Sequence, residues 1–123
     1  MEEILKIEEI NDDVNSGFQI TTDSRIINLC INNGQHCCEK WGYLSTPDDT
    51  SEYIGAYIYS IELVDTALKK STFIDFLESA NAMFLNINTD IGILQFAVYN
   101  SHNGYYGHSA YLSGTDIDCQ VCL

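Results

Sequence analysis

The sequence predicts an α+β fold, a single domain built mainly from an antiparallel sheet of about five to seven strands with one or two short helices. Apolar and polar residues alternate along several short segments, which is typical of half-buried strands. Asn, Asp, Gly and Ser separate these segments at short intervals and indicate turns. The chain has 123 residues and 46% hydrophobic content, which suits one domain with a real core.

The N-terminal segment, residues 1–16, is the most ambiguous element of this domain. Isoleucines recur there every three residues with Leu5 beside them, and glutamates occupy the opposite positions. This spacing fits a short amphipathic helix and an acidic first strand equally well. The Asn-Ser-Gly run at 15–17 is expected to end the element.

Residues 17–112 are expected to form the core of the sheet. Strands 18–22 and 26–32 should pair across Asp23-Ser24. Asn33-Gly34 predicts a type I′ hairpin that joins 26–32 to the next strand. The predicted strands are 18–22, 26–32, 37–42, 56–65, 81–88, 91–99 and 108–112. The last three are expected to form a meander around 91–99, which is apolar on both faces and therefore central.

Two short helices are expected beside the sheet. The run from Ser45 through Thr46 and Pro47 to Asp49 has the form of a helix start, with a hydroxyl cap, a proline at the first helical position and acids at the positive end of the dipole. Residues 73–79 predict one or two further helical turns. Residues 113–123 are expected to be a C-terminal tail.

The charge balance excludes one class of partner. The chain has 18 acidic and five basic residues, so its formal net charge is -13. Phosphates repel such a chain, and direct nucleic-acid binding is therefore not expected. The charge suits solubility, cation binding or docking on a basic protein surface. Because the sequence shows no signal-peptide core and no apolar run of membrane-spanning length, a cytoplasmic protein without membrane contact is expected.

The acidic residues cluster in two stretches. A solvated face is the ordinary explanation for such runs, and neither stretch matches an EF-hand loop. If the acids instead meet a basic partner, the expected contact residues are Glu8, Glu9, Asp12, Asp13, Asp48, Asp49 and Glu52.

The five cysteines are expected to be thiols or metal ligands rather than disulfides. Cys119 and Cys122 have the spacing of half a zinc site. Cys37 or Cys38, together with Cys30 or His36, would have to complete it; the alternative is a set of loose thiols. No catalytic residue is expected. Adjacent strand residues face apart, so His36 is poorly placed as a base for Cys37 or Cys38. We therefore expect no enzyme and no cofactor, with zinc as the alternative.

The aromatic run near the C-terminus allows two interpretations. Asn103-Gly104-Tyr105-Tyr106 fits a hairpin turn followed by strand aromatics, or the rim of a ligand pocket. The residues of such a pocket would be Cys38, Glu39, Trp41, Asn103, Tyr105 and Tyr106.

Two motifs in this order resemble a family of small uncharacterised proteins found in Firmicutes and their phages. That family has a Cys-Cys-Glu motif after a hairpin, here Cys37-Cys38-Glu39, and an Asn-Gly-Tyr-Tyr motif near the end, here 103–106. The resemblance covers roughly 18–112. It implies a phage or prophage origin and an α+β domain, and it implies no established activity.

Charge, resemblance and the lack of a catalytic motif together favour a non-enzymatic binding protein. Its carboxylates would stand in for phosphates and occupy the basic nucleic-acid channel of a host defence protein, such as a CRISPR effector nuclease. The alternative is a binder or sponge for a signalling nucleotide, whose base would stack in the aromatic pocket and whose phosphates would need Arg25 or Lys40. A homodimer is expected if a sheet edge is left unpaired.

Overall fold

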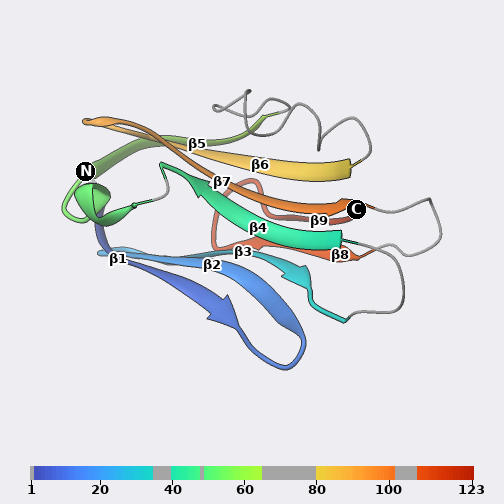
Figure 1. The fold of residues 1–123 in the computed structure, drawn as a ribbon. Coiled ribbons are helices and arrows are strands. Elements are labelled where there is room, and N and C mark those ends of the chain that lie inside the picture. Colours follow the sequence, from blue (N-terminus) through green and yellow to red (C-terminus); the bar gives the residue numbers. More distant parts are fainter. Residues whose placement is uncertain (1, 35–39, 48, 65–79, 102–107) are drawn as a thin grey trace.

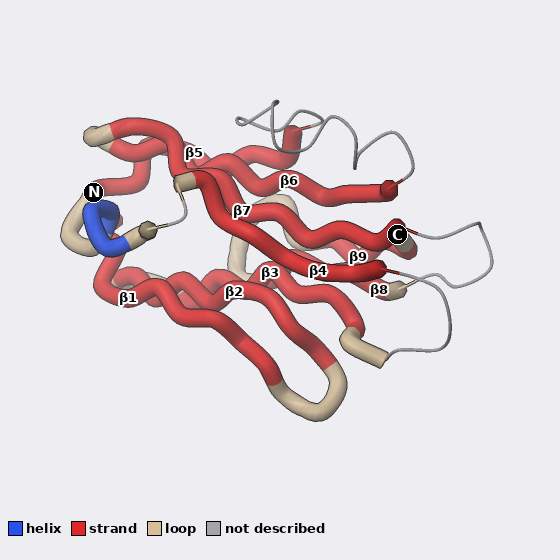
Figure 2. Tube along the Cα trace, viewed as in Figure 1, coloured by secondary structure: helices blue, strands red, loops and turns tan. Residues whose placement is uncertain are grey.

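The computed structural model describes residues 2–34, 40–47, 49–64, 80–101 and 108–123. Over these residues the regular structure is nearly all strand (Figures 1 and 2). The elements are β1 (Glu2–Asn11), β2 (Asn15–Thr22), β3 (Ile26–Asn32), β4 (Lys40–Thr46), the 3-10 turn η1 (Ser51–Tyr53), β5 (Tyr57–Val64), β6 (Ala80–Thr89), β7 (Gly92–Ser101), β8 (Ser109–Ser113) and β9 (Cys119–Cys122). No helix in this part of the chain has the length and apolar character needed to span a bilayer.

The strands form two layers that meet at one corner. Their order is β4-β7-β6-β5-β1-β2-β3-β8-β9, and all neighbours are antiparallel. The link between β5 and β1 consists of two residue pairs, Glu2 with Ile58 and Glu3 with Tyr57. Beyond that link the strands separate into sheet A (β4, β7, β6 and β5) and sheet B (β1, β2, β3, β8 and β9), as Figure 1 shows.

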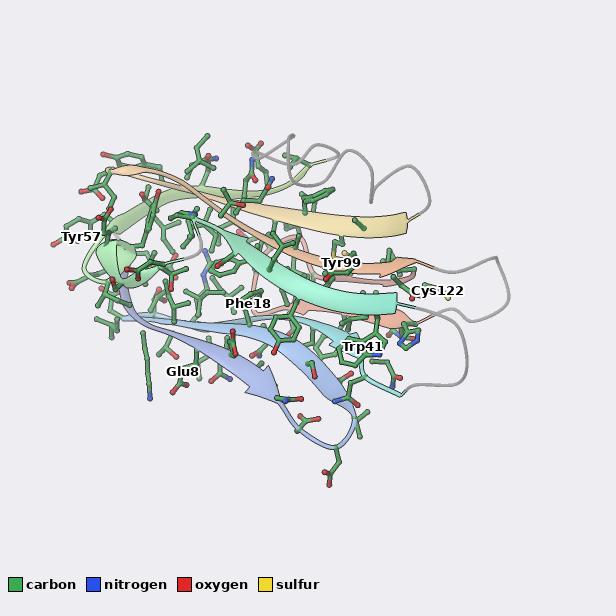
Figure 3. All side chains as sticks on the ribbon, in the orientation of Figure 1. Glu8, Phe18, Trp41, Tyr57, Tyr99 and Cys122 are labelled. Carbon is green, nitrogen blue, oxygen red and sulfur yellow. The ribbon has the colours of Figure 1, made fainter. Side chains whose placement is uncertain are left out.

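The core lies between the two sheets. Phe18 of β2 connects them, since its ring centroid lies 5.3 Å from that of Tyr43 on β4 and 4.6 Å from that of Phe96 on β7. Figure 3 shows Phe18 below β4. The alternation along β7 places Leu94, Phe96 and Val98 toward sheet B, and all three are fully buried. Burial of each such side chain contributes about 1.5–3 kcal/mol.

The expected α+β class is wrong for the described residues. Their one helical element is the three-residue turn η1. Ser45 and Thr46, expected to cap a helix, end β4 instead, and their pairing with β7 extends to Thr46 and Gln95. The residue before a proline favours an extended backbone, which suits a strand end better than a cap. The helical turns expected at 73–79 lie outside the described residues.

The ambiguous N-terminal segment is a strand, and its expected break is wrong. Residues 15–17 begin β2, while the chain reverses at Asp12 to Val14. The Asp12 carboxylate Oδ1 accepts hydrogen bonds from the backbone N–H groups of Val14 and Asn15, at 2.8 and 2.7 Å. The turn is therefore fixed by an aspartate side chain, a role for which Asp is well suited.

The expected pairings are partly confirmed. Strands β2 and β3 pair across 23–24, and β6 pairs with β7. Asn33-Gly34, however, does not close a hairpin, because β3 pairs with β8 while β4 pairs with β7 in the other sheet. The third strand of the expected meander, β8, accordingly leaves β7 for β3, and the expected tail forms β9 on β8. A turn signal locates a reversal of the chain, but it does not select the sheet that the next strand joins.

Candidate functional site

The first candidate site is the acidic hairpin, which we define as Glu8, Glu9, Asp12 and Asp13 at the end of β1 and in the turn before β2. All four side chains are exposed. Lys6 is the neighbouring cation, and its Nζ atom lies 2.9 Å from Oε1 of Glu8. Because both partners are well exposed, this pair contributes little to stability.

The two glutamates of the acidic hairpin project from opposite faces of sheet B. Glu9 lies opposite Phe18 in the β1–β2 pairing, and cross-strand partners share a face. Phe18 points into the core, so Glu9 projects on the side of sheet A. Figure 3 shows Glu8 pointing away from the sandwich. Burial raises the pKa of Tyr43 on β4, and the negative charge of Glu9 raises it further.

The other acids expected to contact a partner lie away from the acidic hairpin. Asp49 and Glu52 lie beside η1, which follows β4. The next residues are held at the start of β1, where the N–H of Gly55 donates to the carbonyl of Ile4 at 2.7 Å. The acidic hairpin begins four residues beyond Ile4, about 13 Å along β1 at the usual rise of a strand, and extends away from η1. Asp48 lies outside the described residues.

Two of these aspartates also have local structural roles. Asp12 accepts two backbone N–H groups in its turn, and Asp49 accepts the N–H of Ser51 at 3.0 Å. These hydrogen bonds lower the pKa of both carboxyl groups. Glu8, Glu9 and Asp13 are therefore the residues of the acidic hairpin best placed to meet a partner without disturbing a turn.

The second candidate site is a cleft on the side of the sandwich away from β4. Two cavities of about 340 and about 300 Å³ lie along β5, where it faces the end of the chain. The first is lined by Arg25, Tyr59, Ser60, Ile61, Thr115, Asp116 and Ile117. The second is more apolar and is lined by Leu63, Val64, Ala82, Met83, Phe84, Cys119, Val121 and Leu123.

The cation in this cleft is already neutralised. The Nε and Nη2 atoms of Arg25 donate to the two carboxylate oxygens of Glu2, each at 2.8 Å. Burial would raise the pKa of Glu2, but hydrogen bonds from Arg25, Thr22 and Ser24 lower it below its usual value. The hydrogen bond to Glu2 likewise raises the pKa of Arg25. A phosphate entering the cleft would have to compete with this two-point ion pair.

The cysteines of β9 do not have the geometry of half a zinc site. Cys119 pairs with Leu112 on the core face, where it is partly buried, while Cys122 pairs with Ser109 and is exposed. Residues three apart on a strand point to opposite faces, so the two thiols diverge. In the described part of the chain, no group of three or more His, Cys, Asp or Glu side chains is arranged to hold a metal ion. Cys37 lies outside that part.

One residue of the expected aromatic pocket can be placed. Trp41 is half-buried on β4, packs against the core and lies 6.2 Å from the ring of buried His108. The Nδ1 atom of His108 is 2.6 Å from the carbonyl oxygen of Asn32. The remaining pocket residues, Cys38, Glu39, Asn103, Tyr105 and Tyr106, lie outside the described residues.

A comparison with known protein families adds one result. A family described as a domain of unknown function, DUF7448, matches residues 3–112. The chain belongs to this family. The match begins in β1 and ends in β8, so it includes the acidic hairpin and leaves out β9. No curated protein and no solved structure matches the chain. The expectation of an uncharacterised family is thereby confirmed.

Sequence reasoning missed two features of these sites. The Glu2–Arg25 ion pair joins the first residue of β1 to the turn between β2 and β3, and no local motif indicates it. The proximity of Glu9 to Tyr43 depends on which strands stack on each other. The alternation of β1 could have placed Glu9 on the core face, had the segment been identified as a strand.

Proposed function

We propose that this DUF7448 protein is a non-enzymatic binding protein of phage or prophage origin that works in the bacterial cytoplasm. It docks its acidic hairpin onto a basic surface with which a host defence or nucleic-acid-handling protein holds nucleic acid. The observation that carries the proposal is the acidic hairpin itself. Its four carboxylates are exposed, and among the described residues one ion pair is found for them, between Glu8 and Lys6.

The physical argument is one of charge substitution. Carboxylates carried by both faces of a strand and by the following turn can take the place of phosphates along the walls of a basic channel. Glu8 and Glu9 project from both faces of β1, and Asp13 extends from the turn. The net charge of -13 adds long-range attraction to a basic target and speeds association.

The proposal is tested by competition with DNA. A labelled short duplex is bound to each of a panel of basic proteins that hold DNA without sequence preference, and its displacement is followed by fluorescence anisotropy. We expect displacement at about 50 mM salt. Because salt also weakens DNA binding, its effect is measured on the direct binding of the chain to the same panel member, which should be at least about tenfold weaker at about 200 mM. Failure to displace DNA from every panel member, or direct binding that salt does not change, would contradict the proposal.

A matched pair of variants tests whether the acidic hairpin is responsible for the competition with DNA. The triple variant Glu8→Gln, Glu9→Gln, Asp13→Asn removes three charges from the acidic hairpin. The triple variant Glu52→Gln, Glu62→Gln, Asp116→Asn removes three charges from exposed positions elsewhere. Only the first is expected to lose competition. Equal loss in both would show that overall charge, and not the acidic hairpin, drives binding.

The nucleotide-binding alternative has weaker support. Its phosphates would need a cation, and the described Arg25 is already bound to Glu2 on two points. Its base would need an open aromatic face, and Trp41 packs against the core.

A further inference from the structure

Among the described strands, β4 has a neighbour on one edge only, and we call its other edge the open edge. From Lys40–Ser101 to Thr46–Gln95, β4 pairs with β7 on one side. On its other side no strand of the described residues pairs with it, since β4 ends the strand order. Such an edge presents backbone N–H and C=O groups that can pair with an added strand. In Figure 1, β4 is the front strand of sheet A, and β1 and β2 lie below it.

Sheet B extends beneath this edge. The contact of Tyr43 with Phe18 places β4 above β2, and β1 is the next strand outward from β2. Strands in a sheet lie about 4.8 Å apart, and packed sheets about 10 Å apart. A strand added to the edge of β4 would therefore lie above β1.

The face of β1 below that position has a distinct composition. Ile7, Glu9 and Asn11 lie opposite Ile20, Phe18 and Ser16 of β2, which are buried on the core face. We call these three β1 residues the β1 shelf. Ile7 is partly buried and packs against the core, while Glu9 and Asn11 are exposed. The β1 shelf thus offers an apolar contact and a carboxylate on the same face.

The negative charge of the β1 shelf indicates which kind of strand would bind there. The ion pair of Lys6 is made with Glu8, which projects from the opposite face, so it does not neutralise Glu9. A second copy of the chain would bring another net charge of -13 to this side and would be repelled. An extended segment rich in Lys or Arg would be attracted instead.

We propose that the open edge of β4 takes up an extended basic segment of the partner protein as an added strand. Alternate side chains of that segment contact Ile7 and Tyr43 and place a Lys or Arg beside Glu9. Backbone pairing supplies the affinity and the β1 shelf supplies the selectivity, as in other cases of strand addition. This inference rests on the proposed function and names the part of the partner that makes contact.

A peptide probe tests the backbone pairing. The probe is a capped peptide of about ten residues with alternating Lys and Val, and the reporter is the fluorescence of Trp41, the one tryptophan of the sequence, which lies on β4. Two further peptides carry N-methyl groups on all Lys or on all Val residues. Backbone N–H groups of successive residues point to opposite edges of a strand, so only the Lys set or only the Val set can donate hydrogen bonds to β4. The peptide methylated on that set should bind at least about tenfold more weakly, and the other methylated peptide should bind like the parent. Equal binding by all three overturns the proposal.

A matched variant tests the β1 shelf. Glu9→Gln should weaken binding of the parent peptide severalfold, whereas Glu62→Gln, which removes one exposed charge from β5, should leave it unchanged. An equal effect of both variants overturns the placement beside Glu9. A dimer in native mass spectrometry that the peptide does not dissociate would make a second copy the occupant and would also overturn the proposal.

The outcome can be separated from that of the proposed function. If the acidic-hairpin triple variant loses competition with DNA while all three peptides bind equally, the proposed function holds and strand addition fails. If the wild-type protein displaces no DNA and one methylated peptide still loses affinity, strand addition holds for another kind of partner.

Discussion

The β1–β4 side and the β5–β9 side of the sandwich both leave part of the core near the surface. On the first, the partly buried residues include Ile7 and Tyr43, and exposed Glu9 lies beside them. On the second, the partly buried residues include Ile61 and Cys119, and the nearby charge of Arg25 is tied to Glu2. Among the described residues Arg25 has a counter-ion in Glu2, whereas no ion pair is found for Glu9. The comparison teaches that, of these two charges, the one on the β1–β4 side is the more open to a charged partner.

The largest expected effect comes from removing the Phe18 ring from the core on the β1–β4 side. Phe18→Ala should lower the free energy of unfolding by about 3–5 kcal/mol, because the ring is 5% exposed and contacts both Tyr43 and Phe96. Urea denaturation measures the loss. The matched change on the other side, Cys119→Ala, removes a smaller and partly exposed side chain and should cost less than about 1.5 kcal/mol. Similar losses in the two variants would contradict the assigned role of Phe18.

The next effect concerns the ion pair of the β5–β9 side. Glu2→Gln should destabilise the protein by about 1–2 kcal/mol at pH 7, since it removes the charge that Arg25 contacts on two points. Urea denaturation of the wild type and the variant gives the difference. A variant as stable as the wild type would show that the pair contributes nothing.

The same pair has a defined pH dependence. The folded-state pKa of Glu2 is lowered, so its stabilising contribution is fully present above the unfolded-state value, about 4.3, and is lost as the pH falls through the folded-state value. The difference between wild type and Glu2→Gln should therefore be constant from about pH 7 to about pH 5 and shrink below about pH 4. A difference that grows on acidification would contradict the assignment.

A smaller effect probes the two faces of β9. In a background with Cys37→Ser and Cys38→Ser, alkylation should modify exposed Cys122 first and half-buried Cys119 later. Cys30 should react at least about tenfold more slowly than Cys122, because it is fully buried and burial raises its pKa. Mass spectrometry of timed samples gives the order. Equal rates for Cys119 and Cys122 would contradict the face assignment.

The smallest effect separates binding from stability. The triple variant of the acidic hairpin should change the free energy of unfolding by less than about 1 kcal/mol, because all three side chains are exposed and none caps a turn. Thermal unfolding of this variant and of the matched triple variant checks the expectation. A large loss in the first alone would mean that any defect in binding reflects misfolding.

The charge and most of the strands could be predicted from the sequence, but β1 stayed ambiguous, β9 was expected to be a tail, and the arrangement of the strands could not be predicted. Alternation located β5, β6 and β7 closely, and the Asp23-Ser24 turn identified the β2–β3 pair. The helix expected at Pro47 failed because long-range pairing of β4 with β7 outweighed a local capping preference. The partners of β4 and β8 also depend on contacts far apart in the sequence.

The candidate site, too, could be predicted only in part from the sequence. The residue types of the acidic hairpin were visible in the sequence. The position of Glu9 beside Tyr43 was not, since it requires both the register of β1 on β2 and the stacking of β4 above β2. Nor could the sequence separate Asp12, which fixes a turn, from Asp13, which has no such role in the structure described.

The most direct test of the central claim is hydrogen exchange of the backbone amides, with and without a basic protein that the chain displaces from DNA. We expect added protection in the acidic hairpin and along β4, and unchanged exchange in β5 and β9. Added protection in β5 and β9, with β1 and β4 unchanged, would contradict the claim and move the binding site to the cleft.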